Sequence, residues 1–267
     1  MWSQVLALLG SKGIGSQKAA QVVRWQEQTV RVRHTFGLVR SEPPRRKGAL
    51  RSYASVLGEV YAAVAEVTGA RVIVDSSKRP SDGAILRLVP GVSPYYVHLV
   101  RDPRAVAHSW RRSKAHLDQS APAEMRRHNP VGSTTSWTLW NLAIEALRRR
   151  HDPSGSMLLR YEDFVIRPRA SIEAIVEMIG ESASELPFED ETTVRLSGNH
   201  TISGNPSRFS TGKVALRSDD EWKRIQSSPD RAIATGLALP LLHRYGYPLR
   251  PRSSTGALSD AESDRGG

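Results

Sequence analysis

The sequence contains no cysteine among its 267 residues. This absence excludes a disulfide scaffold, a zinc site with cysteine ligands, an iron–sulfur cluster and catalysis by a thiol. Long hydrophobic runs are lacking too. The longest run near the start, Val5 to Leu9, is far shorter than the roughly 20 apolar residues that span a bilayer. Because no basic segment precedes this run and no clear cleavage site follows it, we expect neither a signal peptide nor a transmembrane segment, and we expect a cytoplasmic location.

Acidic residues are scarce relative to basic ones. The 38 lysines and arginines exceed the 27 aspartates and glutamates, which gives a net charge of +11. Such a balance favours polyanionic or phosphorylated partners, although it does not decide the fold. The net charge is the only feature that indicates a nucleic-acid partner. Because the basic residues are scattered along the chain, we do not expect such a partner. The sequence leaves the oligomeric state open.

Hydrophobic patterning predicts alternating helices and strands in the middle of the chain. Apolar residues fall on one helical face from 49 to 68, and Gly69 is a natural stop for that helix. Short apolar runs at 71–75, 95–100 and 157–161 predict strands, the first of them covered on both faces. Strands that alternate with helices predict an α/β fold, a parallel sheet with helices on both faces.

Further helices and one long loop complete the expected order. Helices are predicted over about 134–150 and 172–179, and two closing helices around Trp222 and over 232–247. Residues 197–218 are rich in Ser, Gly, Asn and Arg and are expected to form a loop of a length that is usually functional or mobile.

Composition divides the chain into three expected parts. Residues 1–48 are a basic helical segment, and residues 49–250 are the α/β domain. Residues 251–267 have almost no apolar side chains, so we expect a disordered tail.

The most distinctive local sequence covers residues 99–110. Arg101 follows a predicted strand, Asp102 and the proline after it open a helix, and Ser109 lies about two turns farther on. Ligands of open parallel sheets bind at the carboxyl ends of the strands. At that edge, a helix N-terminus offers N–H groups that can donate to phosphate oxygens. The guanidinium of an arginine also matches the geometry of phosphate oxygens. The alternative is that Arg101 only pairs with Asp102 or with another carboxylate.

A second segment, from Asp75 to Lys78, ends the strand predicted before it. Lys78 could reach a transferring anionic group, and Asp75 could contact a hydroxyl. Alternatively, Asp75 and the two serines cap a turn and Lys78 is solvated.

Two more segments carry polar residues of interest. Arg208 and Lys213 lie in the expected long loop, where they could close over phosphates, or the loop is an ordinary surface feature. Tyr161, Glu162 and Asp163 follow the third predicted strand, where the carboxylates are either catalytic or part of an architectural turn.

Taken together, these segments resemble the sulfotransferases that use 3′-phosphoadenosine 5′-phosphosulfate (PAPS). The resemblance covers roughly residues 50–247. It implies a fold like that of P-loop nucleoside triphosphate hydrolases, which sulfotransferases share, and transfer of a sulfuryl group to a hydroxyl or amine of a small-molecule, carbohydrate or lipid acceptor. It rests on six motifs in the family's order: VIVDSSKRP, VHLVRDPRAVAHSW, LLRYEDFVIRP, SGNPSRFSTGKV, DDEWK and HRYGYP.

The resemblance also implies roles for the donor-binding residues. Arg101 and Ser109 match the family's ligands of the 3′-phosphate. Arg208 and Lys213 match a loop that covers the nucleotide, and Tyr161 is a neighbour of the adenine.

The same resemblance implies catalytic roles. Lys78 is the expected electrostatic stabiliser of the transferring group, and Asp75 a possible general base. By analogy with phosphoryl transfer, catalysis would consist mainly of positioning and charge stabilisation, and no metal is expected.

One part of the family pattern is not found. Members begin with a strand, a loop of the PRSGTT kind that binds the 5′-phosphosulfate, and a helix. The glycine-rich residues 10–16 match neither that loop nor a Walker A loop, and we expect them to form a turn between helices. We therefore expect a family member that lacks this first strand and loop, with either impaired transfer or a non-catalytic role in binding nucleotides or other partners.

Overall fold

The structure is a computed structural model, and it describes residues 1–42, 48–111, 115–116, 123–124, 129–183, 185–198 and 210–250. The expected tail at 251–267 and the predicted phosphate ligand Arg208 lie outside the described residues. None of the helices in the described ranges is both long enough and apolar enough to cross a membrane.

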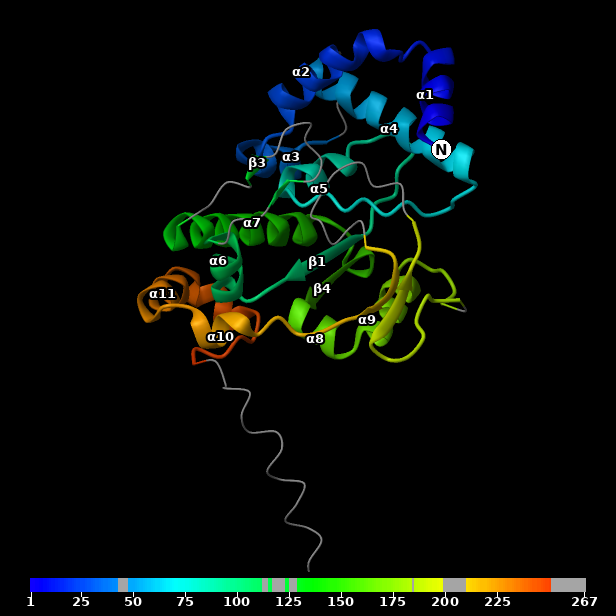
Figure 1. Cartoon of the computed structure of the whole chain (residues 1–267). Helices are drawn as coiled ribbons and strands as arrows, with labels where there is room; N and C mark the ends of the chain where they lie inside the picture. Colours follow the sequence, from blue (N-terminus) through cyan, green and yellow to red (C-terminus); the bar gives the residue numbers. More distant parts are fainter. Residues whose placement is uncertain are drawn as a thin grey trace, which may run out of the picture.

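Helices make up the N-terminal part of the chain (Figure 1). They are α1 (Trp2–Ser11), α2 (Ala19–Thr29), α3 (Thr35–Arg40) and α4 (Ala49–Thr68). Val5 and Leu9 of α1 form a buried cluster with Ala63 of α4. Two glycines turn the chain with positive φ angles: Gly13 (φ 72°) lies between α1 and α2, and Gly69 (φ 68°) follows α4. The predicted turn and the predicted end of α4 are therefore confirmed.

A parallel pair of strands, β1 (Tyr96–Val100) and β4 (Ser156–Arg160), lies at the centre of the molecule. Both strands were expected from their apolar runs. The connection between them contains α6 (Pro103–Arg111), β2 (Ala115–His116), β3 (Ala123–Glu124) and α7 (Pro130–Arg150). Figure 1 shows α7 above the two strands, and α8 (Tyr161–Ile166) and α9 (Pro168–Met178) below them. The fold class, a parallel sheet with helices on both faces, is confirmed.

The remaining elements flank this centre. α5 (Pro80–Leu86) lies beside α3 and α7, and α11 (Ser228–Arg244) packs on α6 and α7. The short helix α10 (Glu221–Ile225) contacts α6. The chain reaches α10 from β6 (Gly212–Ala215), which pairs with β5 (Thr193–Leu196).

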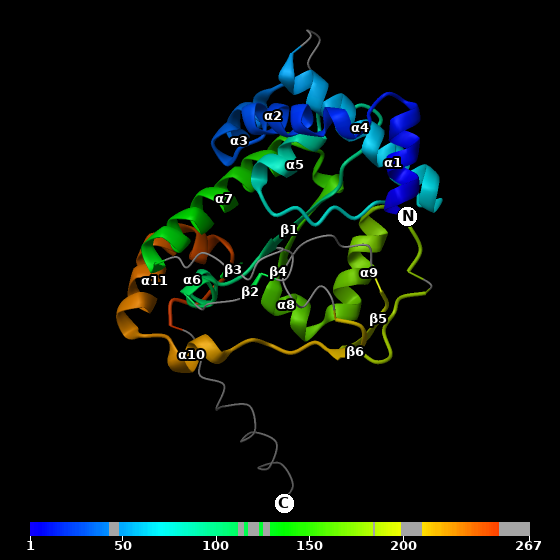
Figure 2. The ribbon, with the colours of Figure 1, turned by 45° about the horizontal axis from the view of Figure 1, so that its top comes forward.

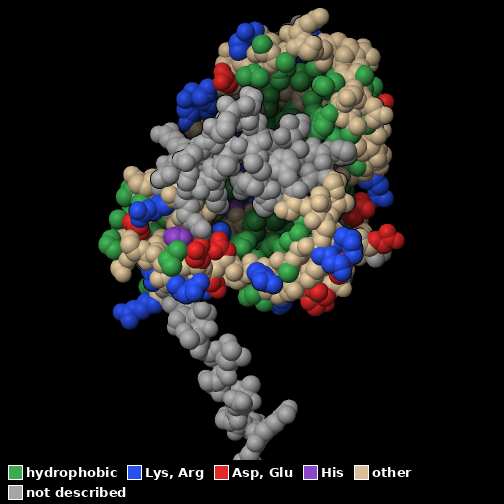
Figure 3. All heavy atoms as spheres, in the orientation of Figure 1, with side chains coloured by type: hydrophobic (Ala, Val, Ile, Leu, Met, Phe, Trp, Pro, Cys, Tyr) green, Lys and Arg blue, Asp and Glu red, His purple; other side chains and the backbone are tan. Residues whose placement is uncertain are grey.

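The two faces of β1 differ in burial. Tyr96, His98 and Val100 are buried on the side of α7, whereas Val97 and Leu99 are 40% and 55% exposed. Figure 3 shows hydrophobic side chains around a hollow below the N-terminal helices on this side of the molecule. One buried cluster joins α3, α4 and α5 to Tyr96 of β1 and Leu147 of α7, and another joins Val100 of β1 to Trp137 of α7 and to α11. The face of β1 toward α7 is therefore the buried one.

The strand predicted over 71–75 is wrong. This stretch is extended, but it pairs with no strand, and Val74 is 87% exposed. A strand forms only where a neighbour's N–H and C=O groups pair with its own, and the described residues offer this stretch no such neighbour. In Figures 1 and 2 it runs on the side of β1 away from β4.

The loop predicted over 197–218 is also wrong in part. Residues Gly212–Ala215 form β6, whose register with β5 places Lys213 opposite Arg195. The pairing depends on residues about twenty positions earlier, which the local composition cannot indicate. Residues 199–209, in the middle of the expected loop, lie outside the described residues.

A histidine links the sheet to α7. His98 Nε2 lies 2.7 Å from Asn141 Oδ1 on α7, and Asn141 Nδ2 donates to the carbonyl of Trp137, 2.7 Å away. The amide orientation makes Oδ1 the acceptor, so Nε2 carries the proton in the neutral ring. Burial lowers the pKa of His98 to about 4, so the side chain is neutral at pH 7.

We predict that His98 makes stability depend on pH. Its pKa is lower in the folded state than in the unfolded state, so its contribution is complete above about pH 6.5 and is lost as the pH falls toward 4. In urea denaturation, lowering the pH from 7 to 4.5 should reduce the free energy of unfolding of the wild type by about 2.5 kcal/mol more than that of His98→Leu. Equal losses in the two proteins would contradict this assignment.

Candidate functional site

Two predicted site residues lie together at the tips of the parallel strands. Arg101 directly follows β1, and Tyr161 directly follows β4. The register pairs Val100 with Arg160, which brings the two tips to the same level. Arg101 Cζ lies 4.6 Å from the centroid of the Tyr161 ring, a distance at which the guanidinium is attracted to the aromatic face.

The Arg101 side chain keeps unused hydrogen-bonding capacity. Its Nη2 donates to Asp219, at 2.9 Å to Oδ2 and 3.3 Å to the backbone oxygen. Its Nε is buried and has no hydrogen-bond partner among the described residues. An oxyanion could accept from this group, although it would have to compete with the carboxylate of Asp219. Of the two alternatives left open by the sequence, pairing with a neighbouring carboxylate does occur, but the partner is Asp219 rather than Asp102.

Asp102 instead pairs with Arg104, a residue that no sequence motif singled out. The Arg104 Nε and Nη2 donate to the two Asp102 oxygens at 2.9 and 2.6 Å, and the Arg104 backbone N–H donates to Oδ1 at 2.9 Å. The last of these bonds is the predicted cap of α6. The Arg104 side chain is fully buried. It also donates to the carbonyls of Pro248 and Leu249, both at 2.9 Å, and stacks on Trp222.

Glu162 connects the two strand tips. Its carboxylate accepts from the backbone N–H of Asp102 at 3.1 Å, and it lies 2.8 Å from the Tyr247 hydroxyl. That hydroxyl is also 3.2 Å from the Val100 carbonyl. Burial raises the pKa of Tyr247, so its phenol remains a donor. These contacts favour the architectural alternative for the carboxylates after β4.

Ser109 and Lys213 occupy separate elements. Ser109 is partly buried on the last turn of α6, the helix that begins beside Arg101. Lys213 lies on β6 and forms an ion pair with Glu189 at 2.6 Å, beside the pair of Glu189 with Arg195. The hydrogen bond from Lys213 lowers the pKa of Glu189. The phosphate contacts of Ser109 and Lys213 remain predictions.

Asp75 and Lys78 lie on the exposed extended stretch. Asp75 accepts from the backbone N–H of Ser77 at 2.7 Å and from the Tyr61 hydroxyl at 2.5 Å. Partial burial acts to raise the pKa of Asp75, but these hydrogen bonds outweigh it and lower the pKa below its ordinary value. Asp75 is therefore already occupied by local hydrogen bonds, as in the structural alternative, and it is ionised at neutral pH.

The described residues hold no group of three or more His, Asp or Glu side chains that could bind a metal ion. The chemistry available at the strand tips is anion recognition by a guanidinium beside an aromatic face. The backbone N–H groups of Asp102 and Arg104 at the start of α6 already donate to carboxylates.

Comparisons with known proteins concern the family of the chain. The sequence pattern of the sulfotransferase family matches residues 12–185, which is more than half of the chain and includes Arg101, Ser109 and Tyr161. Among solved structures, the chain is similar to the sulfotransferase domain from the curacin biosynthetic pathway, with 21% identity, coverage of 72% of this chain and 68% of that chain, and a TM-score of 0.47. No curated protein matches.

We predict that Arg104→Met destabilises the protein by about 3–5 kcal/mol, because it leaves the buried Asp102 carboxylate without its cation. The matched control is Arg31→Met, which removes an exposed pair with Glu27 and should cost at most about 1 kcal/mol. Urea denaturation at pH 7 measures both. A loss for Arg104→Met no larger than that of the control would show that the buried pair does not stabilise the fold.

Proposed function

Because the chain belongs to the sulfotransferase family, we propose that it transfers a sulfuryl group from PAPS to a hydroxyl or amine of a small-molecule, carbohydrate or lipid acceptor. The observation that carries the proposal is the Arg101 guanidinium 4.6 Å from the Tyr161 ring at the carboxyl ends of β1 and β4. This edge of a parallel sheet is where such folds bind ligands.

The donor would bind at the strand tips. Arg101 and Ser109 would hold its 3′-phosphate, and Tyr161 would lie beside its adenine. Among the described residues, the buried Arg101 Nε has no hydrogen-bond partner. Because a buried donor without an acceptor is unfavourable, this supports a phosphate oxygen as its acceptor. Lys213, and Arg208 outside the described residues, would contact phosphates from the segment after β5.

The catalytic groups would come from the extended stretch before α5. PAPS supplies a sulfuryl group whose sulfur is attacked by the acceptor oxygen while the bond from sulfur to the bridging phosphate oxygen breaks. Lys78 would offset the negative charge that grows on the departing oxygen. Asp75 would accept the acceptor's proton, and its low pKa makes it a weak base that is always ionised near neutral pH.

A second function is supported by the same stretch. Val74 is 87% exposed beside Asp75, and Asp75 is occupied by Tyr61 and Ser77. If these hydrogen bonds prevent Asp75 from accepting the acceptor's proton, the chain would bind the nucleotide without transferring the sulfuryl group. Nucleotide binding without transfer across a broad acceptor panel would favour this second function.

We predict that Arg101→Ala weakens binding of 3′-phosphoadenosine 5′-phosphate by about 10- to 100-fold, because it removes charge-assisted hydrogen bonds. Asp219→Asn should strengthen binding severalfold, since it removes the competing carboxylate. Isothermal titration calorimetry measures both, with Arg24→Ala on α2 as the control that leaves affinity unchanged. Equal affinity in the wild type and Arg101→Ala would place the nucleotide elsewhere.

We predict that Lys78→Met lowers kcat for sulfuryl transfer about 100-fold while KM for PAPS changes little. Asp75→Asn should lower kcat by about 10²- to 10⁴-fold. Because the pKa of Asp75 is low, wild-type activity should persist in mildly acid solution and fall only where that carboxyl is protonated. Transfer of labelled sulfate from the donor measures these rates. Wild-type rates in both variants would exclude these residues from the reaction.

A further inference from the structure

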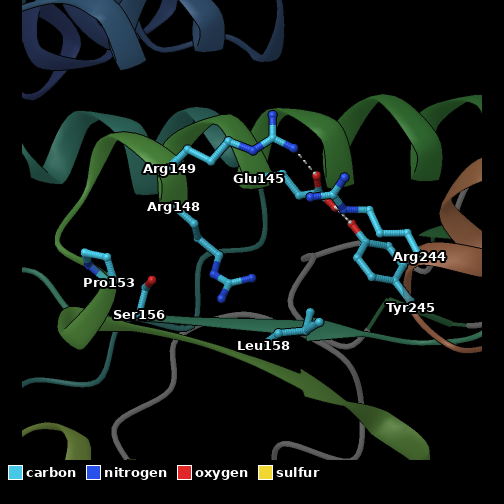
Figure 4. A pocket seen from close by; sticks show the side chains of 8 residues that line it. All are labelled: Glu145, Arg148, Arg149, Pro153, Ser156, Leu158, Arg244 and Tyr245. Carbon is cyan, nitrogen blue, oxygen red and sulfur yellow. Dashed lines mark hydrogen bonds and ion pairs between the residues drawn. The ribbon is translucent and has the colours of Figure 1, made fainter.

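A second cluster of arginines lies at the other end of the sheet. A cavity of about 370 Å³ opens between the C-terminal end of α7, the first residues of β4 and the end of α11 (Figure 4). β4 contributes Ser156 and Leu158 to its wall, from the first half of the strand, whereas Tyr161 follows the last residue of that strand. The cavity is therefore separate from the Arg101–Tyr161 site. Its polar side chains are Glu145, Arg148, Arg149, Ser156, Arg244 and Tyr245.

Glu145 compensates only part of this positive charge. Its side chain is 6% exposed and accepts from Arg149 at 3.0 Å, Arg244 at 2.8 Å and the Tyr245 hydroxyl at 2.8 Å. Three donors occupy the two carboxylate oxygens. One carboxylate therefore serves two arginines, and it makes no hydrogen bond or ion pair with Arg148.

Arg148 is the unsatisfied group of the cluster. Across the described ranges it forms neither a hydrogen bond nor an ion pair, and its Nε is buried without a partner. Figure 4 shows its guanidinium extending from α7 toward β4, into the space beside Ser156. A partly desolvated cation without an acceptor is unfavourable, so an anion in this space would be stabilised.

The charge and size of the cavity define the ligand. Three arginines against one glutamate leave two positive charges, which matches a dianion. An arginine fork suits the oxygens of a phosphate or sulfate group. The apolar wall formed by Pro153 and Leu158 leaves room for a small organic group attached to that anion, within the range of volumes of small-molecule sites.

We propose that this cavity is an anion site for a phosphate or sulfate group, free or as a small monoester, with Arg148 as its main ligand and the Ser156 hydroxyl beside it. The site is independent of the sulfuryl-transfer reaction, because none of its residues belongs to the strand tips or to the stretch from Asp75 to Lys78.

The test is a titration of the full ¹⁵N-labelled chain with inorganic phosphate, at ionic strength held constant with chloride. The wild type should show saturable NMR shifts at amides of residues 145–158. Arg148→Met should weaken this binding at least tenfold. Arg24→Met on α2 should leave the affinity unchanged, and so should Arg101→Ala, which removes any phosphate bound at the strand tips.

Ser156→Asp is a second variant, needed if Arg148→Met does not fold. It places a carboxylate beside Arg148 and should also weaken phosphate binding at least tenfold. Parallel titrations with inorganic sulfate and glycerol 3-phosphate identify the source of the anion: tighter binding of the monoester assigns an organic ligand, and equal binding assigns the free ion. The proposal is overturned if no saturable shift occurs at 145–158, or if neither Arg148→Met nor Ser156→Asp changes the affinity there.

Discussion

The buried ion pair between Asp102 and Arg104 is the interaction on which the strand-tip site depends. Removing both charges from water is costly, and such a pair persists only where its other hydrogen-bonding groups are satisfied. Here the guanidinium also reaches the carbonyls of Pro248 and Leu249, so the turn after β1 is fixed to the C-terminal segment of the domain. Because Arg101 immediately precedes this turn, the bonds that fix the turn also fix the position of Arg101.

The second strand tip is held by a separate but adjoining set of bonds. Glu162 accepts from the backbone of Asp102, and Tyr247 reaches both Glu162 and the end of β1. As a result, Arg101 and Tyr161 lie beside each other at the ends of two strands that these bonds connect. Asp219, on the segment before α10, supplies the carboxylate that pairs with Arg101. Figure 2 shows this segment passing alongside α8. The two ends of the sheet therefore differ: at the tips a carboxylate offsets the arginine, and at the other end Arg148 has none among the described residues.

Local signals in the sequence were sufficient for much of the fold. The helical period and Gly69 predicted α4, the apolar runs predicted β1 and β4, and Asp102 predicted the start of α6. The features that could not be predicted depend on partners far away in the chain. The run at 71–75 has strand composition but no pairing neighbour among the described residues, and β6 pairs with a distant segment. Arg104 donates to the carbonyls of Pro248 and Leu249, which lie more than 140 positions away. For the site, sequence order brought Arg101 and Tyr161 to one edge of the sheet, but it could not indicate that Asp219 would meet Arg101.

The central claim is that the tips of β1 and β4 form one binding site for an adenosine 3′,5′-bisphosphate. The most direct measurement is a crystal structure of the full chain grown with 3′-phosphoadenosine 5′-phosphate. It should show the 3′-phosphate within hydrogen-bond distance of the Arg101 guanidinium, with the Asp219 carboxylate displaced and the adenine beside Tyr161. A nucleotide bound away from both residues, with the Arg101–Asp219 pair intact, would contradict the claim.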